Sequence, residues 1–283
     1  MKSRRLMAGM VFPIYAFTLL FVLFPIVYMI VISFMSRAEV WGFVNDFTLD
    51  NYKQILEPIN LRTFGQSLKL AGIATVLNVL IGYPFGYFLS RLSDTWRRRV
   101  MLLIMIPFWT SSLIRLYGWI IIFRSNGVLD SLLMGMGLTD APLKLLFSYE
   151  AVVVGMIYAL LPMMILSVYS SASKLDFELM AAARDLGASR FAAFRTVALP
   201  LTMPGLFSGV ILTFIPAMGL FFIADILGGN KIVLVGSLIQ QQLTKGRNIP
   251  FAAALSVVLL VLTSIMIRLY KVIFKTDQLE GLI

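Results

Sequence analysis

The stretch AVVVGMIYALLPMMILSVYSSAS, residues 151–173, decides the fold, because none of its 23 residues carries a charge. A helix of about 20 apolar residues crosses the roughly 30 Å hydrocarbon layer of a membrane. Similar charge-free runs occupy residues 6–36, 70–90, 196–224 and 248–267, and a run at 100–123 is interrupted only by Arg115. We therefore expect an all-α polytopic membrane protein with six transmembrane helices, near 9–34, 68–90, 100–123, 150–172, 204–224 and 249–270.

Composition supports this fold class and excludes several functions. Of the 283 residues, 59% are apolar and 13% are charged, whereas soluble domains have about 25% charged residues. No polar block is long enough to fold separately, so we expect one transmembrane domain over residues 1–283. The chain has no cysteine and no histidine. Thiolate and imidazole ligands are therefore excluded, and we expect neither a metal site nor catalytic residues.

The basic residues predict an orientation. Lysine and arginine accumulate in cytoplasmic segments of membrane proteins. One set of alternate segments holds 14 basic and 6 acidic residues, and the other holds 10 and 8. The first set of segments, which includes both termini, is therefore expected to be cytoplasmic. The net charge of +10 thus reflects the orientation in the membrane rather than nucleic-acid binding. Its basic residues are Lys2, Arg4, Arg5, Arg91, Arg97, Arg98, Arg99, Lys174, Arg184, Arg190, Arg195, Arg268, Lys271 and Lys275.

A long cytoplasmic loop, residues 171–203, has the periodicity of helices. Leu175, Leu179, Ala182 and Leu186 recur at helical spacing, and Asp176 can cap the start of a helix. Gly187 can end that helix in a left-handed conformation. Ser189 can then cap a second helix, expected to stop at Leu199-Pro200. On the outer side, loop 37–66 is expected to hold a short helix that begins near Asp50.

The small residues of this loop permit two interpretations. Alanines at 181–183 allow another protein's backbone to approach closely, beside the polar residues Arg184, Asp185 and Arg190. An amphipathic hairpin resting on lipid headgroups would show the same pattern. These features alone leave both interpretations open.

The spacing of the loop resembles a known motif. Ala182-Ala183 is followed after three residues by Gly187, and after nine more by Val197, Leu199 and Pro200. This pattern resembles the EAA loop of ABC importer permeases, in which Ala181 is usually glutamate. The resemblance implies a type I (MetI-like) permease fold and a coupling helix that docks on an ATPase. The implied contacts are Ala181, Ala182, Ala183, Arg184, Asp185, Gly187, Arg190 and Pro200.

Further stretches resemble one branch of that family, the spermidine/putrescine permeases of the PotB type. These are PFWTSSLIR at 107–115, residues 182–205, and PAMGLF at 216–221. The branch implies polyamine import across the bacterial cytoplasmic (inner) membrane. It also implies a second permease (PotC-like), two ATPase subunits (PotA-like) and a periplasmic or extracellular polyamine-binding protein (PotD-like). Because related permeases carry other solutes, another small solute stays open as an alternative.

A polycation pathway should offer aromatic faces and carboxylates. Trp109 lies ten residues beyond Arg99, about 15 Å along a continuous helix and thus in mid-bilayer. It could equally pack between helices. Asp225 is expected at the outer surface, where it would attract a cation or simply be solvated. The candidate pathway residues are Phe108, Trp109, Thr110, Tyr117 and Asp225.

Two residues inside the spans have structural interpretations. Arg115 lies about 24 Å along the same helix and would repel a polycation in the pathway. We expect it to pair with an acid or with backbone carbonyls at a helix end. Pro216 is expected to bend its helix as a hinge, although membrane helices also contain prolines for packing.

ATP and magnesium are expected on the partner subunits, because the chain contains no Gly-x-x-x-x-Gly-Lys-Ser/Thr motif. ATPase closure would push the 174–190 helix and switch the spans from inward-facing to outward-facing. An ion-driven secondary transporter is the main rival, yet such proteins usually carry ionisable residues within their spans. A membrane enzyme or scaffold is disfavoured by the missing histidine, cysteine and paired carboxylates.

Overall fold

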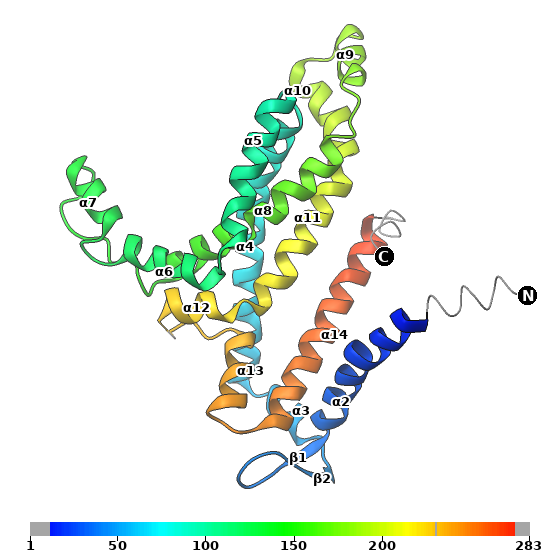
Figure 1. Ribbon diagram of the computed structural model, residues 1–283, viewed down its shortest axis with the longest axis vertical. Coiled ribbons are helices and arrows are strands. Elements are labelled where there is room, and N and C mark those ends of the chain that lie inside the picture. Colours follow the sequence, from blue (N-terminus) through cyan, green and yellow to red (C-terminus); the bar gives the residue numbers. More distant parts are fainter. Residues whose placement is uncertain (1–11, 230, 275–283) are drawn as a thin grey trace, which may run out of the picture. The chain divides into compact units, whose positions relative to one another are not determined.

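The computed structural model describes residues 12–229 and 231–274, and most of this part of the chain is helical (Figure 1). Within it, five helices are long and apolar enough to cross a membrane: Phe12–Ser33, Pro58–Ser90, Tyr149–Ala172, Arg190–Gly219 and Ile249–Leu269. A sixth crossing is reached if Asp94–Trp109 and Ser112–Gly135, which are bent by 97°, count as one span. The sequence has five uninterrupted charge-free runs and one interrupted run, and these agree with the five long helices and the one bent pair.

Most elements follow one another with short connections, and a longer segment, residues 136–148, joins α7 to α8. The first half contains η1 Leu19–Leu23, α2 Phe24–Ser33, β1 Met35–Arg37, β2 Phe43–Phe47, α3 Asp50–Ile55, α4 Pro58–Ser90, α5 Asp94–Met105, η2 Ile106–Trp109, α6 Ser112–Phe123 and α7 Val128–Gly135. The second contains α8 Tyr149–Ala172, α9 Glu178–Asp185, α10 Arg190–Ala193, η3 Phe194–Ala198, α11 Leu199–Gly219, α12 Phe221–Gly228, α13 Val235–Thr244 and α14 Ile249–Phe274.

Contacts divide the chain into two compact units, one of Met1–Arg62 with Leu238–Met266, and one of Thr63–Ser237 with Ile267–Ile283. In the first unit, β1 and β2 form an antiparallel hairpin that the sequence did not predict. Asn51 anchors this hairpin, because its Nδ2 donates to the carbonyls of Ser33, at 3.0 Å, and Met35, at 2.9 Å.

The short helix predicted near Asp50 is confirmed as α3. The Asp50 backbone N–H donates to Thr48 Oγ1, at 3.1 Å. Lys53 Nζ donates to Asp50 Oδ1, at 2.8 Å, and this hydrogen bond holds the pKa of the Asp50 carboxyl below its ordinary value. Both interactions fix the exposed first turn of the helix.

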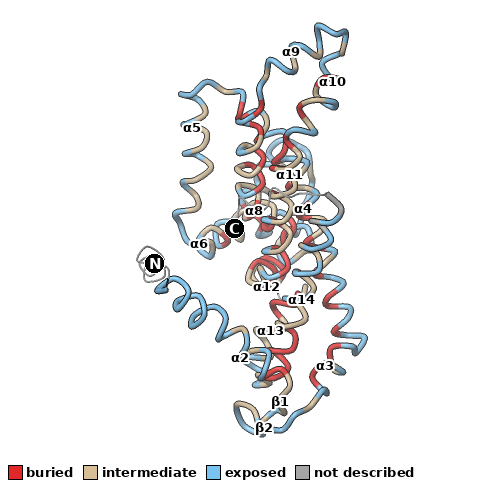
Figure 2. Tube along the Cα trace, turned by 90° about the vertical axis from the view of Figure 1, so that its right-hand side faces the viewer, coloured by how far each residue is buried: buried red, intermediate tan, exposed pale blue. Residues whose placement is uncertain are grey.

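The second unit is built around α8, which packs between α4 and α11, and its buried residues gather there (Figure 2). Glycines let these helices approach closely, as is common between membrane helices. A Cβ atom on Gly86 of α4 would lie 2.7 Å from the Ile165 carbonyl oxygen, and one on Gly205 of α11 would lie 2.6 Å from that of Ser167. The three helices therefore form a tight frame for the segments attached to their ends.

Three predicted spans have different bounds in the structure. The second helix begins at Pro58 instead of near 68. The fifth begins at Arg190 and ends at Gly219, where 204–224 was expected. The third, expected as a continuous helix over 100–123, is broken after Trp109. The basic residues Lys2, Arg4, Arg5 and Lys275, which carry part of the topology prediction, lie outside the described residues.

Candidate functional site

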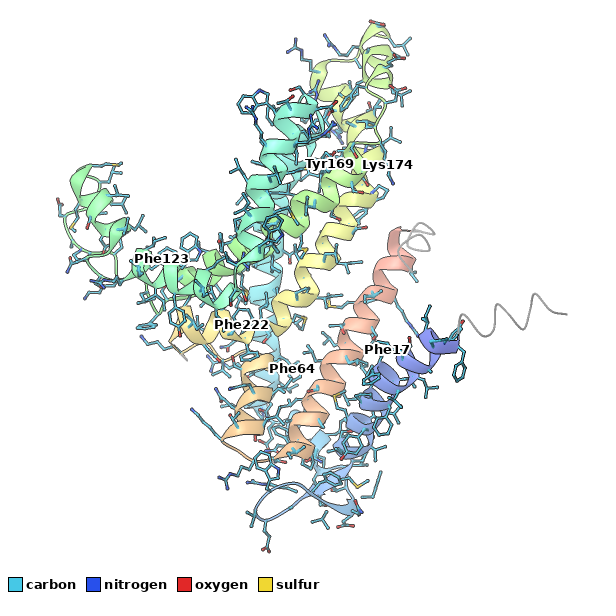
Figure 3. The ribbon with its side chains drawn as sticks, viewed as in Figure 1. Phe17, Phe64, Phe123, Tyr169, Lys174 and Phe222 are labelled. Atoms are coloured by element: carbon cyan, nitrogen blue, oxygen red, sulfur yellow. The ribbon has the colours of Figure 1, made fainter. Side chains whose placement is uncertain are left out.

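The predicted cytoplasmic loop begins at the end of α8, near Lys174, which Figure 3 labels. Its first helix, α9, starts at Glu178, and Asp176 lies two residues before it. Asp176 Oδ1 accepts a hydrogen bond from the Glu178 backbone N–H, at 2.9 Å. Asp176 therefore does stabilise the helix start, as predicted, although Phe177 occupies the cap position itself.

Gly187 ends α9 as predicted. Its φ of +92° is left-handed, a region that favours glycine. The Gly187 N–H donates to the Arg184 carbonyl, at 2.9 Å, and the Ala188 N–H to that of Ala183, at 3.0 Å. This pair of hydrogen bonds is a Schellman motif, which satisfies carbonyls at the helix end.

Ser189 caps the second helix, because its Oγ accepts the Ala192 N–H at 3.1 Å. The prediction that this helix stops at Leu199-Pro200 is wrong. Helix α10 continues through the π-helical turn η3 into α11. Pro200 follows directly after this π-helical turn, a local irregularity of the kind at which a helix accommodates a residue without an N–H. The end of the loop is thus directly joined to a membrane-crossing helix.

The apolar series of the loop divides into a buried and an exposed part. Leu175 is 7% exposed, whereas Leu179 and Leu186 are 49% and 90% exposed. Helix α9 lies at one end of its unit, beyond the end of α8, in both views (Figures 1 and 2). The exposed leucines and the alanines between them form a surface that the described residues of this chain leave uncovered.

An aromatic cluster, defined by Tyr83, Tyr87, Phe177 and Phe194, lies beneath α9 and was missed by sequence reasoning. The Tyr87 ring contacts those of Phe194 and Phe177, with centroids 5.4 and 6.4 Å apart. The guanidinium of Arg91 lies 5.3 Å from the Phe177 centroid. Tyr83 and Tyr87 of α4 and Arg91, the first residue after its end, recur every four residues, a spacing that could have indicated one helix face.

A buried hydrogen bond continues this connection into the spans. Tyr83 Oη of α4 lies 2.8 Å from Thr202 Oγ1 of α11. Tyr83 also makes an edge contact with Phe194, at 6.2 Å between ring centroids. The predicted cytoplasmic loop is thereby linked through side chains to two of the long helices, α4 and α11.

The predicted pathway residues of the third span lie at a sharp bend. Phe108 and Trp109 belong to η2, and Thr110 has the extended backbone that separates it from α6. Trp109 is 77% exposed and Tyr117 is 60% exposed. The assumption of a continuous helix, from which a mid-bilayer Trp109 was derived, is therefore wrong. The described residues of this chain thus leave the Trp109 and Tyr117 side chains largely uncovered.

Arg115 has different partners from those expected. Its guanidinium carbon lies 5.2 Å from the ring centroid of Phe108 and 5.7 Å from that of Tyr158. Among the described residues, its buried Nε has no hydrogen-bond partner, and no acid pairs with it. The expected pairing with an acid or carbonyls is thus wrong, and Arg115 instead holds η2 against α8 through cation–π contacts.

Asp225 was predicted to attract a cation at the outer surface or simply to be solvated. In the structure it belongs to a helix and is half-buried. It lies on α12, and its Oδ1 accepts a hydrogen bond from Ser237 Oγ, at 2.8 Å.

Pro216 was predicted to bend its helix as a hinge. It lies three residues before the end of α11, at Gly219, and the chain turns from α11 into α12 at Leu220. Helices α6 and α12, which carry Tyr117 and Asp225, are in contact, and Figure 3 labels Phe123 and Phe222 on them.

The predicted residues therefore form two separate groups. The loop residues Ala181, Arg184, Asp185 and Arg190 line one cavity together, while the pathway candidates lie on η2, α6 and α12. Among the described residues, no cluster of three acidic, histidine or cysteine side chains could hold a metal ion.

Comparison with known proteins assigns the family. Residues 79–276 match the model of the binding-protein-dependent transport system inner membrane component. The chain belongs to this family of permeases. The permease is thus a multi-pass inner-membrane component, and the matched region includes the whole of the loop predicted to be cytoplasmic.

Curated relatives of the permease extend over nearly its full length. It is 41% identical over 257 residues to the spermidine/putrescine transport system permease protein PotB of Haemophilus influenzae, covering 91% of this chain and 90% of the relative. It is also 41% identical over 261 residues to PotB of Escherichia coli, covering 92% and 95%. The resemblance to the PotB branch is confirmed.

Solved structures support the fold. A bacterial ABC transporter that imports the acidic polysaccharide alginate contains a chain with a TM-score of 0.77 and 16% identity, covering 98% of the permease and 97% of that chain. A structure of a bacterial alginate ABC transporter in complex with an alginate pentasaccharide-bound periplasmic protein contains a chain with a TM-score of 0.76 and 15% identity, covering 95% of the permease and 94% of that chain. The MetI-like permease fold is thereby confirmed.

Proposed function

We propose that this chain is the membrane-spanning permease subunit of an ATP-driven importer of polyamines, such as spermidine and putrescine. The observation that carries the proposal is the 41% identity to PotB proteins over about nine tenths of both chains. The geometry of the loop, in which two capped helices meet at Gly187, supports a docking role for it. ATP and magnesium would bind partner ATPases.

The connections within the second unit suggest how force would pass through the permease. Movement of α9 would be transmitted by Phe177 and Tyr87 to α4, and by the continuous α10–η3–α11 helix to the fifth span. The Tyr83–Thr202 hydrogen bond would keep these two long helices moving together. Such rigid connections are needed if closure of two ATPases is to switch the spans between inward-facing and outward-facing states.

The polyamine pathway would use the exposed aromatic residues at the bend of the third span. Trp109 and Tyr117 offer uncovered ring faces, which attract cations. Asp225 supplies a carboxylate on the neighbouring α12. A second permease subunit would complete the pathway, and a soluble binding protein would deliver the polyamine from outside.

The test is ATP hydrolysis by the reconstituted complex of both permeases and the ATPases. We expect hydrolysis to rise several-fold when spermidine- or putrescine-loaded binding protein is added, and to stay at its basal rate with the same protein loaded with an uncharged solute. If ATPases co-purify but no polyamine stimulates them, the substrate proposal fails. Ion-driven uptake by this chain alone, without an ATPase, would contradict the whole proposal.

A further inference from the structure

The loop of residues 171–203, which we call the coupling loop, carries two adjoining cavities. Both are lined by Ala181, Arg184 and Arg190. One has a volume of about 380 Å³, and its other lining residues are Asp185, Ala188 and Ser189. The second has about 440 Å³ and reaches inward to α4. It is lined by Tyr87, Arg91, Phe177, Met180, Ala181, Arg184, Arg190 and Phe194. We call this second one the arginine cavity.

The charge of the arginine cavity is unbalanced. Three guanidinium groups line it, and no acidic residue does. In the described part of the chain, the two ion pairs, Lys53–Asp50 and Arg97–Asp94, lie elsewhere. Exposed arginines are commonly just solvated, so positive charge alone would not make a binding site.

Apolar side chains that line the arginine cavity, those of Tyr87, Phe177 and Met180, distinguish it from a solvated surface. Arg91 lies over the rings of Phe177 and Tyr87, with its guanidinium carbon 5.3 and 6.0 Å from their centroids. Met180 Sδ accepts a hydrogen bond from Tyr87 Oη, at 3.3 Å. Arg91 is exposed, like Arg184 and Arg190, but its ring contacts orient the guanidinium. The apolar side chains beside it lower the local dielectric, which strengthens attraction to an anion.

We propose that the arginine cavity receives a glutamate or aspartate side chain of the ATPase subunit. This inference rests on the proposed function, because it names the chemistry of the same docking contact. A carboxylate matches the fork of an arginine with two parallel hydrogen bonds. The small side chain of Ala181 leaves room in the cavity for a carboxylate supplied by the partner.

A protein partner fits this position better than a lipid headgroup. Helix α9 extends beyond the end of α8, away from the core of the unit (Figure 1). Leu179 on α9 and Leu186, the residue that follows α9, are exposed and would be buried by a docked subunit. An anionic lipid is the competing occupant, and it predicts a dependence on bilayer composition.

Substitution of Ala181 gives the sharpest test. Ala181→Glu would place a carboxylate beside Arg184 and Arg190 and occupy the site from within. Ala181→Gln introduces a side chain of the same size without the negative charge, so it would not form an ion pair with these arginines. We expect the ATPase to bind the assembled Ala181→Glu permease pair about fivefold more weakly than the Ala181→Gln pair at low salt. Equal or tighter binding by Ala181→Glu would overturn the proposal.

Charge reversal tests the arginines independently. We expect the double variant Arg184→Glu, Arg190→Glu to weaken ATPase binding at least about tenfold, and Arg195→Glu, which lies outside both cavities, to stay within twofold. A charge-swapped ATPase, with an acidic surface residue changed to arginine, should restore binding to the double variant. Unchanged affinity of the double variant overturns the inference.

The same measurements separate the remaining causes of failure. The complex is assembled in nanodiscs of phosphatidylcholine alone and of phosphatidylcholine with phosphatidylglycerol. An effect of the double variant that appears only with phosphatidylglycerol assigns the cavity to lipid and overturns the inference. If the unaltered permease binds no ATPase in either lipid, the proposed function itself fails.

Discussion

At the scale of single residues, the hydrogen bond between Tyr83 and Thr202 has a defined direction. Thr202 Oγ1 lies 2.8 Å from the Ala198 carbonyl, to which it donates its one proton. Tyr83 must therefore donate to Thr202. We expect Tyr83→Phe to lower the free energy of unfolding by about 1 kcal/mol, measured by thermal unfolding in detergent.

Thr202→Val removes the same hydrogen bond from the other side. The two substitutions together should therefore cost less than the sum of their separate effects. Additive losses would mean that the two hydroxyl groups are not coupled.

Asp130 is a second buried polar residue with a structural role. Asp130 is only 3% exposed. Its two carboxylate oxygens accept hydrogen bonds from the backbone N–H groups of Asn126, at 2.9 Å, and Leu143, at 3.1 Å. We expect Asp130→Ala to destabilise the α7 region by about 1–3 kcal/mol, because both N–H groups lose their acceptor. Amide hydrogen exchange at the two positions measures this loss.

Asp140 provides the matched control, since it is an exposed aspartate in the same loop region. Asp140→Ala should leave exchange at both amides unchanged. Equal protection in the Asp130→Ala and Asp140→Ala variants would contradict the anchoring role.

At the scale of elements, α8 and α11 owe their close packing to the lack of a side chain at Gly205. A Cβ atom there would meet the Ser167 carbonyl oxygen at 2.6 Å, and a backbone atom cannot move aside. We expect Gly205→Ala to cost about 1–3 kcal/mol through overpacking, measured as a lower thermal midpoint of the assembled permease.

Gly72 on α4 is the control, because a Cβ atom there would meet nothing within 4 Å. Gly72→Ala should leave the midpoint unchanged or raise it slightly, since alanine favours helix. If both variants behaved alike, the close approach of α8 and α11 would not limit stability.

The elements also mark where sequence reasoning succeeds and fails. Gly187 and Ser189 were predicted correctly, because caps are local chemistry that few residues decide. The break after Trp109 was not predicted, because Pro107 bends some membrane helices and is absorbed by others. Likewise, Pro200 resembled a helix end, but it lies in a first turn preceded by a π-helical turn. Tertiary contacts, such as those of Arg115 with Phe108 and Tyr158, have no local signature.

At the scale of the whole molecule, the fold depends on the order of apolar runs rather than on particular residues. A chain with only 16% identity has the same fold, with a TM-score of 0.77. The MetI-like arrangement was implied by the resemblance of the loop to the EAA motif, whereas the number of membrane-crossing helices could be predicted from the charge-free runs alone. The proposed substrate could not, because it depends on a few side chains and on partner subunits that complete the pathway.

Orientation is the prediction that concerns the molecule as a whole, and the chain is well suited to test it. It contains no cysteine, so a single introduced thiol is unique. Val40, between β1 and β2, is 72% exposed, and Leu186 on the coupling loop is 90% exposed. We expect a membrane-impermeant maleimide to label Val40→Cys in intact cells, and Leu186→Cys only in inverted vesicles, because segments rich in lysine and arginine are predicted to face the cytoplasm.

Assembly extends the same experiment to the docking proposal. A bound ATPase should protect Leu186→Cys from the maleimide and leave Val40→Cys reactive, since only the first thiol would lie in the interface. Labelling of both thiols from the same side would contradict the orientation. Correct orientation without protection would instead place the ATPase contact elsewhere, because a residue as exposed as Leu186 is reactive unless another subunit covers it.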